Sequence, residues 1–226
     1  MAMRQPIKSM IHGILKARFS YLFFTVVLLF LLRPFVAIPK AVTFVTDIFV
    51  WFLIISCVWA VHEKRKHQWV VIVMAATTVL CDGLDFLLKN ELTSWTSQIL
   101  MVLFLGYAVV AILFYLARQE KVTADMIMAG ASEYVLIGVL WAALYSLIET
   151  VYPGSFSFAG AKDRSGFLYF SFVTLTTTGY GDLLPVSIQA RSLAMFEQLT
   201  GQLFIAITVA RLVSLYTVSS NKKNFV

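Results

Sequence analysis

Long apolar stretches separated by short polar ones dominate the hydrophobic pattern of this chain. Five blocks have the length of a membrane-crossing helix: 19–38, 41–61, 69–88, 95–117 and 132–152. A sixth block runs from about 187 to 216. A helix needs about 20 mainly apolar residues to cross a hydrocarbon core about 30 Å thick. The pattern therefore predicts an all-α membrane protein with six transmembrane helices.

A further apolar stretch, 166–182, lies between the last two blocks and is too short and too rich in glycine to cross. Its part up to Thr176 would form a helix about 16 Å long, which is half a membrane. Such a helix ends near the midplane and directs the negative end of its dipole at a cation there. Irregular backbone at that depth is tolerated only inside protein or beside water. The pattern thus predicts a re-entrant helix and loop that line a pore.

Composition and charge agree with a membrane location. Of the 226 residues, 60% are hydrophobic and 13% are charged, whereas about 25% are charged in soluble domains. The net charge of +6 does not indicate a nucleic-acid partner, because the basic residues lie between apolar blocks instead of forming one face. With the N-terminus inside, twelve basic residues fall inside and six outside. The positive-inside rule then predicts a multi-pass protein of the plasma or inner membrane with both termini cytoplasmic.

Residues 174–182 read Thr-Leu-Thr-Thr-Thr-Gly-Tyr-Gly-Asp. This motif resembles the selectivity filter of potassium channels, whose usual form is Thr-Val-Gly-Tyr-Gly. Carbonyls that replace the water shell of an ion must face one axis, which requires positive φ angles that glycine adopts cheaply. The resemblance implies a filter with K⁺ at Thr177, Thr178, Gly179 and Tyr180, completed by Gly181. It also implies a homotetramer, no cofactor besides the permeant K⁺, and no enzymatic activity.

Some positions depart from the usual form of that motif. Thr178 stands at the usual valine position, and its added hydroxyl is expected to loosen the packing behind the filter. Val173 stands where some simple channels place a glutamate that pairs with the filter aspartate, here Asp182. Tyr169 and Phe170 stand where voltage-gated relatives carry a Trp pair, so Tyr169 is the candidate hydrogen-bond partner of Asp182. We expect Tyr169, Thr176 and Asp182 to support the filter.

Three residues of the last block are candidates for gating. Gly201 follows Gly179 by 22 residues, and the resemblance implies a hinge there; a small residue for close helix packing is the alternative. Glu197 is ionisable inside a span, where function is the default hypothesis, and it predicts either a gating role or a hydrogen bond behind the filter. Arg211 would either reach the membrane interface or repel cations at the gate.

The chain divides into four expected segments. They are an amphipathic cytoplasmic segment on the membrane surface (1–18), a four-helix transmembrane domain (19–125), a pore domain (126–218) and a short cytoplasmic tail (219–226). Residues 93–117 contain no charged side chain, whereas voltage sensing needs several charges in the fourth span. We therefore expect a sensor-like domain without conventional voltage gating, and no soluble ligand-binding domain.

Charged residues in the first three apolar blocks form a predicted cluster. At 1.5 Å per residue, Arg33, Asp47 and Asp82 reach similar depths, and Asp85 follows Asp82 on the same helix face. We expect Arg33 to pair with Asp47 or Asp82. The competing hypothesis is a water-filled crevice in which these acids tune gating.

The sequence leaves two alternatives to a potassium-selective channel. Residues 179–182 also satisfy Gly-x-Gly-Asp, the pattern of intramembrane aspartyl proteases, with Asp82 or Asp85 as a second carboxylate. That hypothesis leaves the threonine run and the preceding half-helix unexplained. A channel subunit that does not conduct is the other alternative, and an intact filter argues against it.

Overall fold

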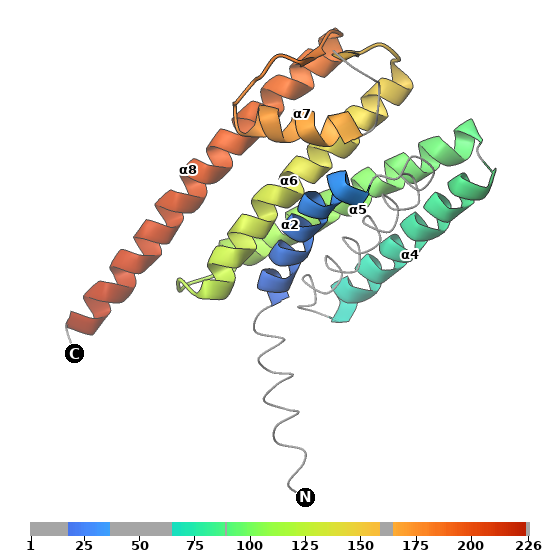
Figure 1. Cartoon of the computed structure of the whole chain (residues 1–226). Coiled ribbons are helices and arrows are strands. Elements are labelled where there is room, and N and C mark those ends of the chain that lie inside the picture. Colours follow the sequence, from blue (N-terminus) through green and yellow to red (C-terminus); the bar gives the residue numbers. More distant parts are fainter. Residues whose placement is uncertain (1–17, 37–64, 89, 159–164, 225–226) are drawn as a thin grey trace, which may run out of the picture.

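A computed structural model describes residues 18–36, 65–88, 90–158 and 165–224 of the chain. This part is mainly helical (Figure 1). Its helices are α2 (Arg18–Val36), α4 (Arg65–Leu88), α5 (Glu91–Arg118), α6 (Ala124–Val151), α7 (Ser165–Leu175) and α8 (Ile188–Asn224). Two short strands, β1 (Phe156–Phe158) and β2 (Leu183–Pro185), flank α7 in the sequence.

Three of the described helices are long and apolar enough to cross a membrane. These stretches are Leu92–Arg118 in α5, Ala124–Val151 in α6 and Ile188–Thr217 in α8. Shorter apolar stretches lie in α2 and α4, at Phe19–Leu28 and Val71–Leu84. The predicted span 41–61 lies outside the described residues. The chain is thus an all-α membrane protein in its described part, while the number of six spans stays a prediction.

Several helices are longer than the apolar blocks that predicted them. Helix α6 begins at Ala124, eight residues before the predicted span, because Thr123 caps it by accepting a hydrogen bond from the Met126 amide at 3.1 Å. Asp125 lies in its first turn, where a negative charge is stabilising. Helix α8 continues to Asn224, into the segment predicted as a tail. Hydropathy marks the apolar length of a helix, whereas caps and polar turns decide where the helix ends.

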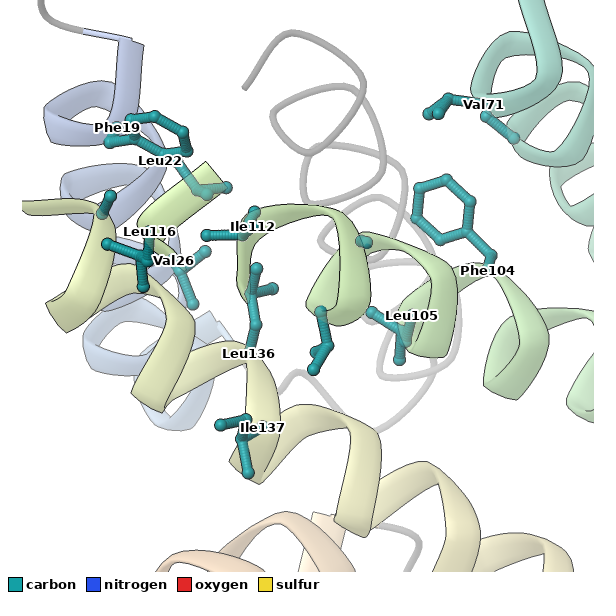
Figure 2. Close-up of a cluster of buried hydrophobic side chains, with 14 of the residues drawn as sticks. Phe19, Leu22, Val26, Val71, Phe104, Leu105, Ile112, Leu116, Leu136 and Ile137 are labelled. Atoms are coloured by element: carbon teal, nitrogen blue, oxygen red, sulfur yellow. The ribbon is translucent and has the colours of Figure 1, made fainter. Parts of the chain in front are cut away.

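An apolar cluster holds the helices around α5 together. Helix α5 packs against both α4 and α6, and α2 packs against α6. Figure 2 shows side chains of α2, α5 and α6 meeting in this cluster, with Val71 of α4 beside Phe104 of α5. Its fully buried members include Phe19, Leu22, Val26, Val71, Phe104, Leu105, Ile112 and Leu136.

The second half of the described chain is arranged around the short helix α7. Figure 1 shows α7 near one end of α6 and α8, and it packs against both. The strands on either side of α7 pair antiparallel, with Phe156 opposite Pro185 and Phe158 opposite Leu183. The loop after α6 is thereby fixed to the chain directly after the Gly-Tyr-Gly-Asp motif.

A buried carboxylate shapes the loop that leads into β1. Glu149, in the last turn of α6, accepts hydrogen bonds from the amides of Gly154 at 3.0 Å and Phe156 at 3.2 Å. Gly154 has a φ of 85°, a left-handed conformation that glycine adopts without penalty. The carboxylate of Glu149 thus replaces the hydrogen-bond partners that these amides would otherwise find in water.

Candidate pore loop

Helix α7 is the half-length helix expected from the sequence. It has 11 residues, or about 16 Å at 1.5 Å per residue. Its Phe167 and Phe170 rings are buried and pack edge-to-face on Phe156, and Phe170 also contacts Tyr145 of α6 at 5.0 Å between ring centroids. Aromatic packing on α6 and β1 therefore positions α7 and the loop that follows it.

The backbone after α7 adopts left-handed conformations at every second residue. Thr177, Gly179 and Gly181 have φ angles of 57°, 59° and 81°. Carbonyls alternate in direction along an ordinary strand, so a change of handedness at every second residue turns them toward one side. This is the conformation that a row of carbonyls facing one axis needs, and it was expected at the two glycines.

The left-handed conformation of Thr177 was not expected. Thr177 is the one non-glycine residue with positive φ in the described part of the chain, and this conformation costs about 1–2 kcal/mol. Its amide donates to the Thr174 carbonyl at 2.9 Å, and the next amide, of Thr178, donates to Val173 at 2.8 Å. The carbonyls at the end of α7 thus hold the first turn of the loop in place.

The hydroxyl at the unusual position 178 has a partner. Thr176 Oγ1 donates to the Phe172 carbonyl at 2.6 Å, and Thr178 Oγ1 lies 2.9 Å from Thr176 Oγ1. Because a hydroxyl has one proton and a carbonyl only accepts, Thr178 is the donor to Thr176. The added hydroxyl therefore ties the loop to the end of α7, where the sequence alone suggested looser packing.

Tyr169 joins the far end of the loop to α7. The Tyr180 ring stacks on the Tyr169 ring, with centroids 6.3 Å apart and an interplanar angle of 4°. The Tyr169 hydroxyl faces the Asp182 carboxylate. Asp182 also accepts a hydrogen bond from the Leu183 amide at 3.1 Å. The structure thus brings together Tyr169 and Asp182, the pair proposed from the sequence.

Glu197 of α8 lies behind α7 in a fully buried site. The Tyr145 hydroxyl hydrogen-bonds to its Oε2 atom, and Ser171 Oγ lies 2.5 Å from its Oε1 atom. Ser171 Oγ also lies 2.7 Å from the carbonyl of Gly138. These contacts connect α6, α7 and α8, and they agree with a hydrogen bond behind the filter. The gating role of Glu197 stays a prediction.

Gly201 lies against the end of α7. A Cβ atom at this position would come within 2.3 Å of the Leu175 carbonyl oxygen. That same oxygen accepts a hydrogen bond from the Tyr134 hydroxyl at 3.3 Å. Close packing thus explains why a glycine stands here, and the hinge implied by the resemblance stays a prediction.

Arg211 contacts the end of α5. Its Nη2 atom donates to the carbonyls of Ala117 at 2.6 Å and Gln119 at 3.0 Å. Carbonyls in the last turn of a helix lack partners within the helix, and a cation there also interacts favourably with its dipole. Arg211 therefore connects α8 to the end of α5, while its role at the membrane interface or at the gate stays a prediction.

The predicted charge cluster stays a prediction. Asp47 lies outside the described residues, and so do the side chains of Arg33 and Asp85. Asp82 is half-buried on α4. Asp182, the candidate catalytic acid of the protease alternative, lies in the loop before β2 and not in a helix, which disfavours that alternative.

Sequence reasoning missed three polar residues of this region: Tyr145, Glu149 and Ser171. Each lies within a stretch that hydropathy assigns to the membrane, and a polar residue there was the available signal. The partners could not be inferred, because Tyr145 and Ser171 lie 52 and 26 residues from Glu197.

The oxygen atoms along the loop that could bind a cation are those of backbone carbonyls and threonine hydroxyls. Among the residues that the structure describes, no group of three His, Cys, Asp or Glu side chains could hold a metal ion. Neutral oxygen ligands of this kind are those of a K⁺ filter.

A half-helix, a loop of alternating handedness and a long apolar helix are the parts expected of a pore-loop membrane protein. Comparison with known proteins agrees: residues 133–218, from α6 into α8, match the model of the ion channel family. The chain is also 32% identical over 88 residues to the inward rectifier potassium channel Kirbac3.1 of Paramagnetospirillum magnetotacticum. The match covers 37% of this chain and 27% of that protein, so it spans about a quarter of the relative's length. No solved structure matches the chain.

Proposed function

We propose that the chain forms a potassium-selective channel, which passes K⁺ down its electrochemical gradient. The observation that carries this proposal is the run of left-handed residues at 177, 179 and 181, directly after a half-length helix. The likeness of residues 133–218 to ion channels, and of part of the chain to a potassium channel, supports the same function.

The pore would be built by four copies of the chain. One chain supplies one loop, and the ring of carbonyls around a K⁺ ion needs four. In the single chain, residues 176–182 are exposed. Large apolar side chains of α8 are exposed as well, among them Met195, Phe196, Leu199, Leu203 and Ile207. Neighbouring copies and lipid would cover these surfaces in the closed four-fold assembly expected of a homo-oligomer.

The channel would not be gated conventionally by voltage. Helix α5 carries charged side chains only at its ends, Glu91 and Arg118. Steep voltage dependence needs about 3–4 charges per subunit that move through the field. The open probability should therefore change only gently with voltage.

Substitution of Gly179 by alanine tests the proposed filter. An added Cβ would meet nothing within 4 Å, so the variant changes the preferred backbone conformation without a clash inside the chain. In proteoliposomes, the wild type should carry K⁺ in preference to Na⁺ under bi-ionic conditions, and Gly179→Ala should not conduct. Gly83→Ala is the matched control, because Gly83 on α4 also has free space around it.

Two outcomes would overturn the proposal. Equal K⁺ and Na⁺ permeability of the wild type would exclude a selective filter, and unchanged selectivity in Gly179→Ala would exclude this loop. Native mass spectrometry should give a mass near four times 25.4 kDa. A tetramer that carries no current under any condition would favour the non-conducting subunit.

A further inference from the structure

Three buried glutamates of the segment from α6 to α8 have different surroundings. Glu133, Glu149 and Glu197 are 0%, 8% and 0% exposed. Transfer of an ionised carboxylate out of water is costly unless a cation or several hydrogen-bond donors compensate for it. The groups around each carboxyl therefore indicate whether it carries a proton.

Glu149 is surrounded by donors. Each of its two oxygens accepts a hydrogen bond from a backbone amide, those of Gly154 and Phe156. An amide N–H can only donate, so these contacts fit an ionised carboxylate.

At Glu197, one of the two oxygens faces a hydroxyl that acts as an acceptor and not as a donor. Ser171 Oγ lies within hydrogen-bond distance of both the Gly138 carbonyl and Glu197 Oε1. The serine has a single proton, and the carbonyl can only accept one. If Ser171 donates to the carbonyl, Oε1 must donate to Ser171, and both short contacts are then hydrogen bonds. An ionised Glu197 would leave one of them as a contact between lone pairs.

The rest of the site agrees with a neutral acid. Oε2 accepts the hydrogen bond of the Tyr145 hydroxyl, as the carbonyl oxygen of a carboxylic acid does. In the described part of the chain, no Lys or Arg forms an ion pair with Glu197. The titratable groups that face it are Tyr145 and Tyr134 of α6, while α7 contributes Ser171.

We propose that Glu197 is a protonated positioning residue, which holds the pore helix α7 between α6 and α8 through a directed chain of hydrogen bonds. In this series of hydrogen bonds, Glu197 donates to Ser171, and Ser171 donates to the Gly138 carbonyl. Once Glu197 loses its proton, Ser171 can no longer accept a hydrogen bond from it, and the Ser171 hydroxyl cannot donate to both Glu197 and the Gly138 carbonyl. A buried negative charge is also left behind the loop. Alkaline conditions should therefore loosen α7 and reduce conduction. The effect on conduction rests on the proposed channel function, but the proton itself does not.

Infrared difference spectroscopy tests the proton independently of any channel activity. A protonated carboxyl has a carbonyl stretch that is separate from the bands of an ionised carboxylate. At neutral pH, wild type minus Glu197→Gln should show the loss of a protonated-acid band. Wild type minus Glu149→Gln should show the loss of carboxylate bands instead.

Glu133 provides an internal reference for this measurement. Neither of its oxygens has a hydrogen-bond partner among the described residues, so Glu133→Gln should remove a protonated-acid band at higher frequency than that of Glu197. Loss of carboxylate bands in Glu197→Gln would show that Glu197 is ionised and would overturn the proposal.

The positioning role is tested by flux measured against pH. Glutamine has the shape of the neutral acid and can donate to Ser171 and accept from Tyr145, so Glu197→Gln should conduct like the wild type at neutral pH. It should also keep its flux at alkaline pH, where that of the wild type falls. Glu197→Ala should lose at least about tenfold in flux at neutral pH, the factor that corresponds to 1.4 kcal/mol.

Glu120→Gln is the control, because Glu120 is exposed in the linker between α5 and α6 and should retain the wild-type pH profile. An identical alkaline loss in wild type and Glu197→Gln would overturn the positioning role. So would equal flux in wild type and Glu197→Ala. A wild type without K⁺ flux would overturn the proposed function, while the infrared bands would still report the proton.

Discussion

In α4 and α5, the hydroxyls of Thr77, Thr78 and Thr96 donate to carbonyls four residues earlier in their own helix. In the segment from α6 to α8, hydroxyl groups form hydrogen bonds between different helices. The Tyr145 hydroxyl donates to Glu197, and the Tyr134 hydroxyl donates to the Leu175 carbonyl. The first region packs mainly through the apolar cluster around α5, and its hydrogen bonds to another helix, between Tyr115 and Asp125 and between Gln98 and Thr150, lead to α6. The second region adds directed polar contacts among its own three helices.

The difference matters in a membrane. Lipid tails are as apolar as leucine, so apolar side chains on helices gain little specificity from burial alone. A hydrogen bond between helices fixes both the direction and the depth of a contact. The loop at 177–181 needs such precision, and it lies in the region where polar contacts link the helices. We therefore expect single substitutions to have larger effects there than in α4 and α5.

A pair of glycine substitutions should show the largest contrast. Gly201→Ala places a Cβ 2.3 Å from the Leu175 carbonyl oxygen, which backbone alone must relieve, whereas Gly106→Ala in α5 meets nothing within 4 Å. We expect Gly201→Ala to cost about 3 kcal/mol or more and to abolish tetramer formation or flux. Gly106→Ala should be neutral or slightly stabilising. Melting temperatures in detergent measure both, and equal values for the two variants would contradict the comparison.

Two hydroxyl deletions should show a smaller contrast. Ser171→Ala removes the central link between Glu197 and the Gly138 carbonyl, and we expect a loss of about 1–2 kcal/mol. Thr77→Ala removes a hydroxyl that is exposed and bonded within its own helix, so its effect should stay within about 0.5 kcal/mol. Thermal unfolding in detergent measures both losses. If Thr77→Ala proves as damaging as Ser171→Ala, contacts between helices are not what distinguishes the two regions.

Arg211 should give the smallest effect, because it joins the two regions at one point. Arg211→Gln removes the cation from the α5 carbonyls and should cost about 0.3–1 kcal/mol, measured as a shift in melting temperature. Arg211→Lys should keep most of the stability, since an ammonium can still donate to these oxygens. Lys121→Gln is the control, because Lys121 is an exposed cation in the linker between α5 and α6, close to the carbonyls that Arg211 contacts. A larger loss in Lys121→Gln would show that net charge and not this contact matters.

The sequence was sufficient for features that depend on local chemistry. The apolar length of 166–176 predicted the half-helix found as α7, and glycine at 179 and 181 predicted the positive φ angles there. Position 177 was different, because threonine disfavours a positive φ angle. The hydrogen bond from the Thr177 amide to the Thr174 carbonyl explains why Thr177 adopts one.

Contacts between distant segments could not be predicted. Hydropathy identifies Glu197 and Arg211 as unusual in an apolar helix, but the partners of Arg211 lie 94 and 92 residues away. The start of α6 at Ala124 depends on the Thr123 cap, which an apolar count does not include. The strand pairing of 156–158 with 183–185 was missed because three-residue strands have no periodicity to detect.

The contact of Gly201 with Leu175 also determines how movement would spread along α8. If this point acts as a fulcrum, Arg211 lies ten residues beyond it and Asn224 lies 23 residues beyond it, or about 15 Å and about 35 Å along a straight helix. A sideways displacement of the end of α5 by about 1 Å would then shift the end of α8 by about 2.3 Å, the ratio of those two lengths. Residues next to Gly201 would stay almost still, whereas the start of α8 at Ile188, 13 residues before Gly201, would move by about 1.3 Å in the opposite direction. The helix therefore has the proportions of a lever, with the short arm held by α5 and the fulcrum set by a glycine.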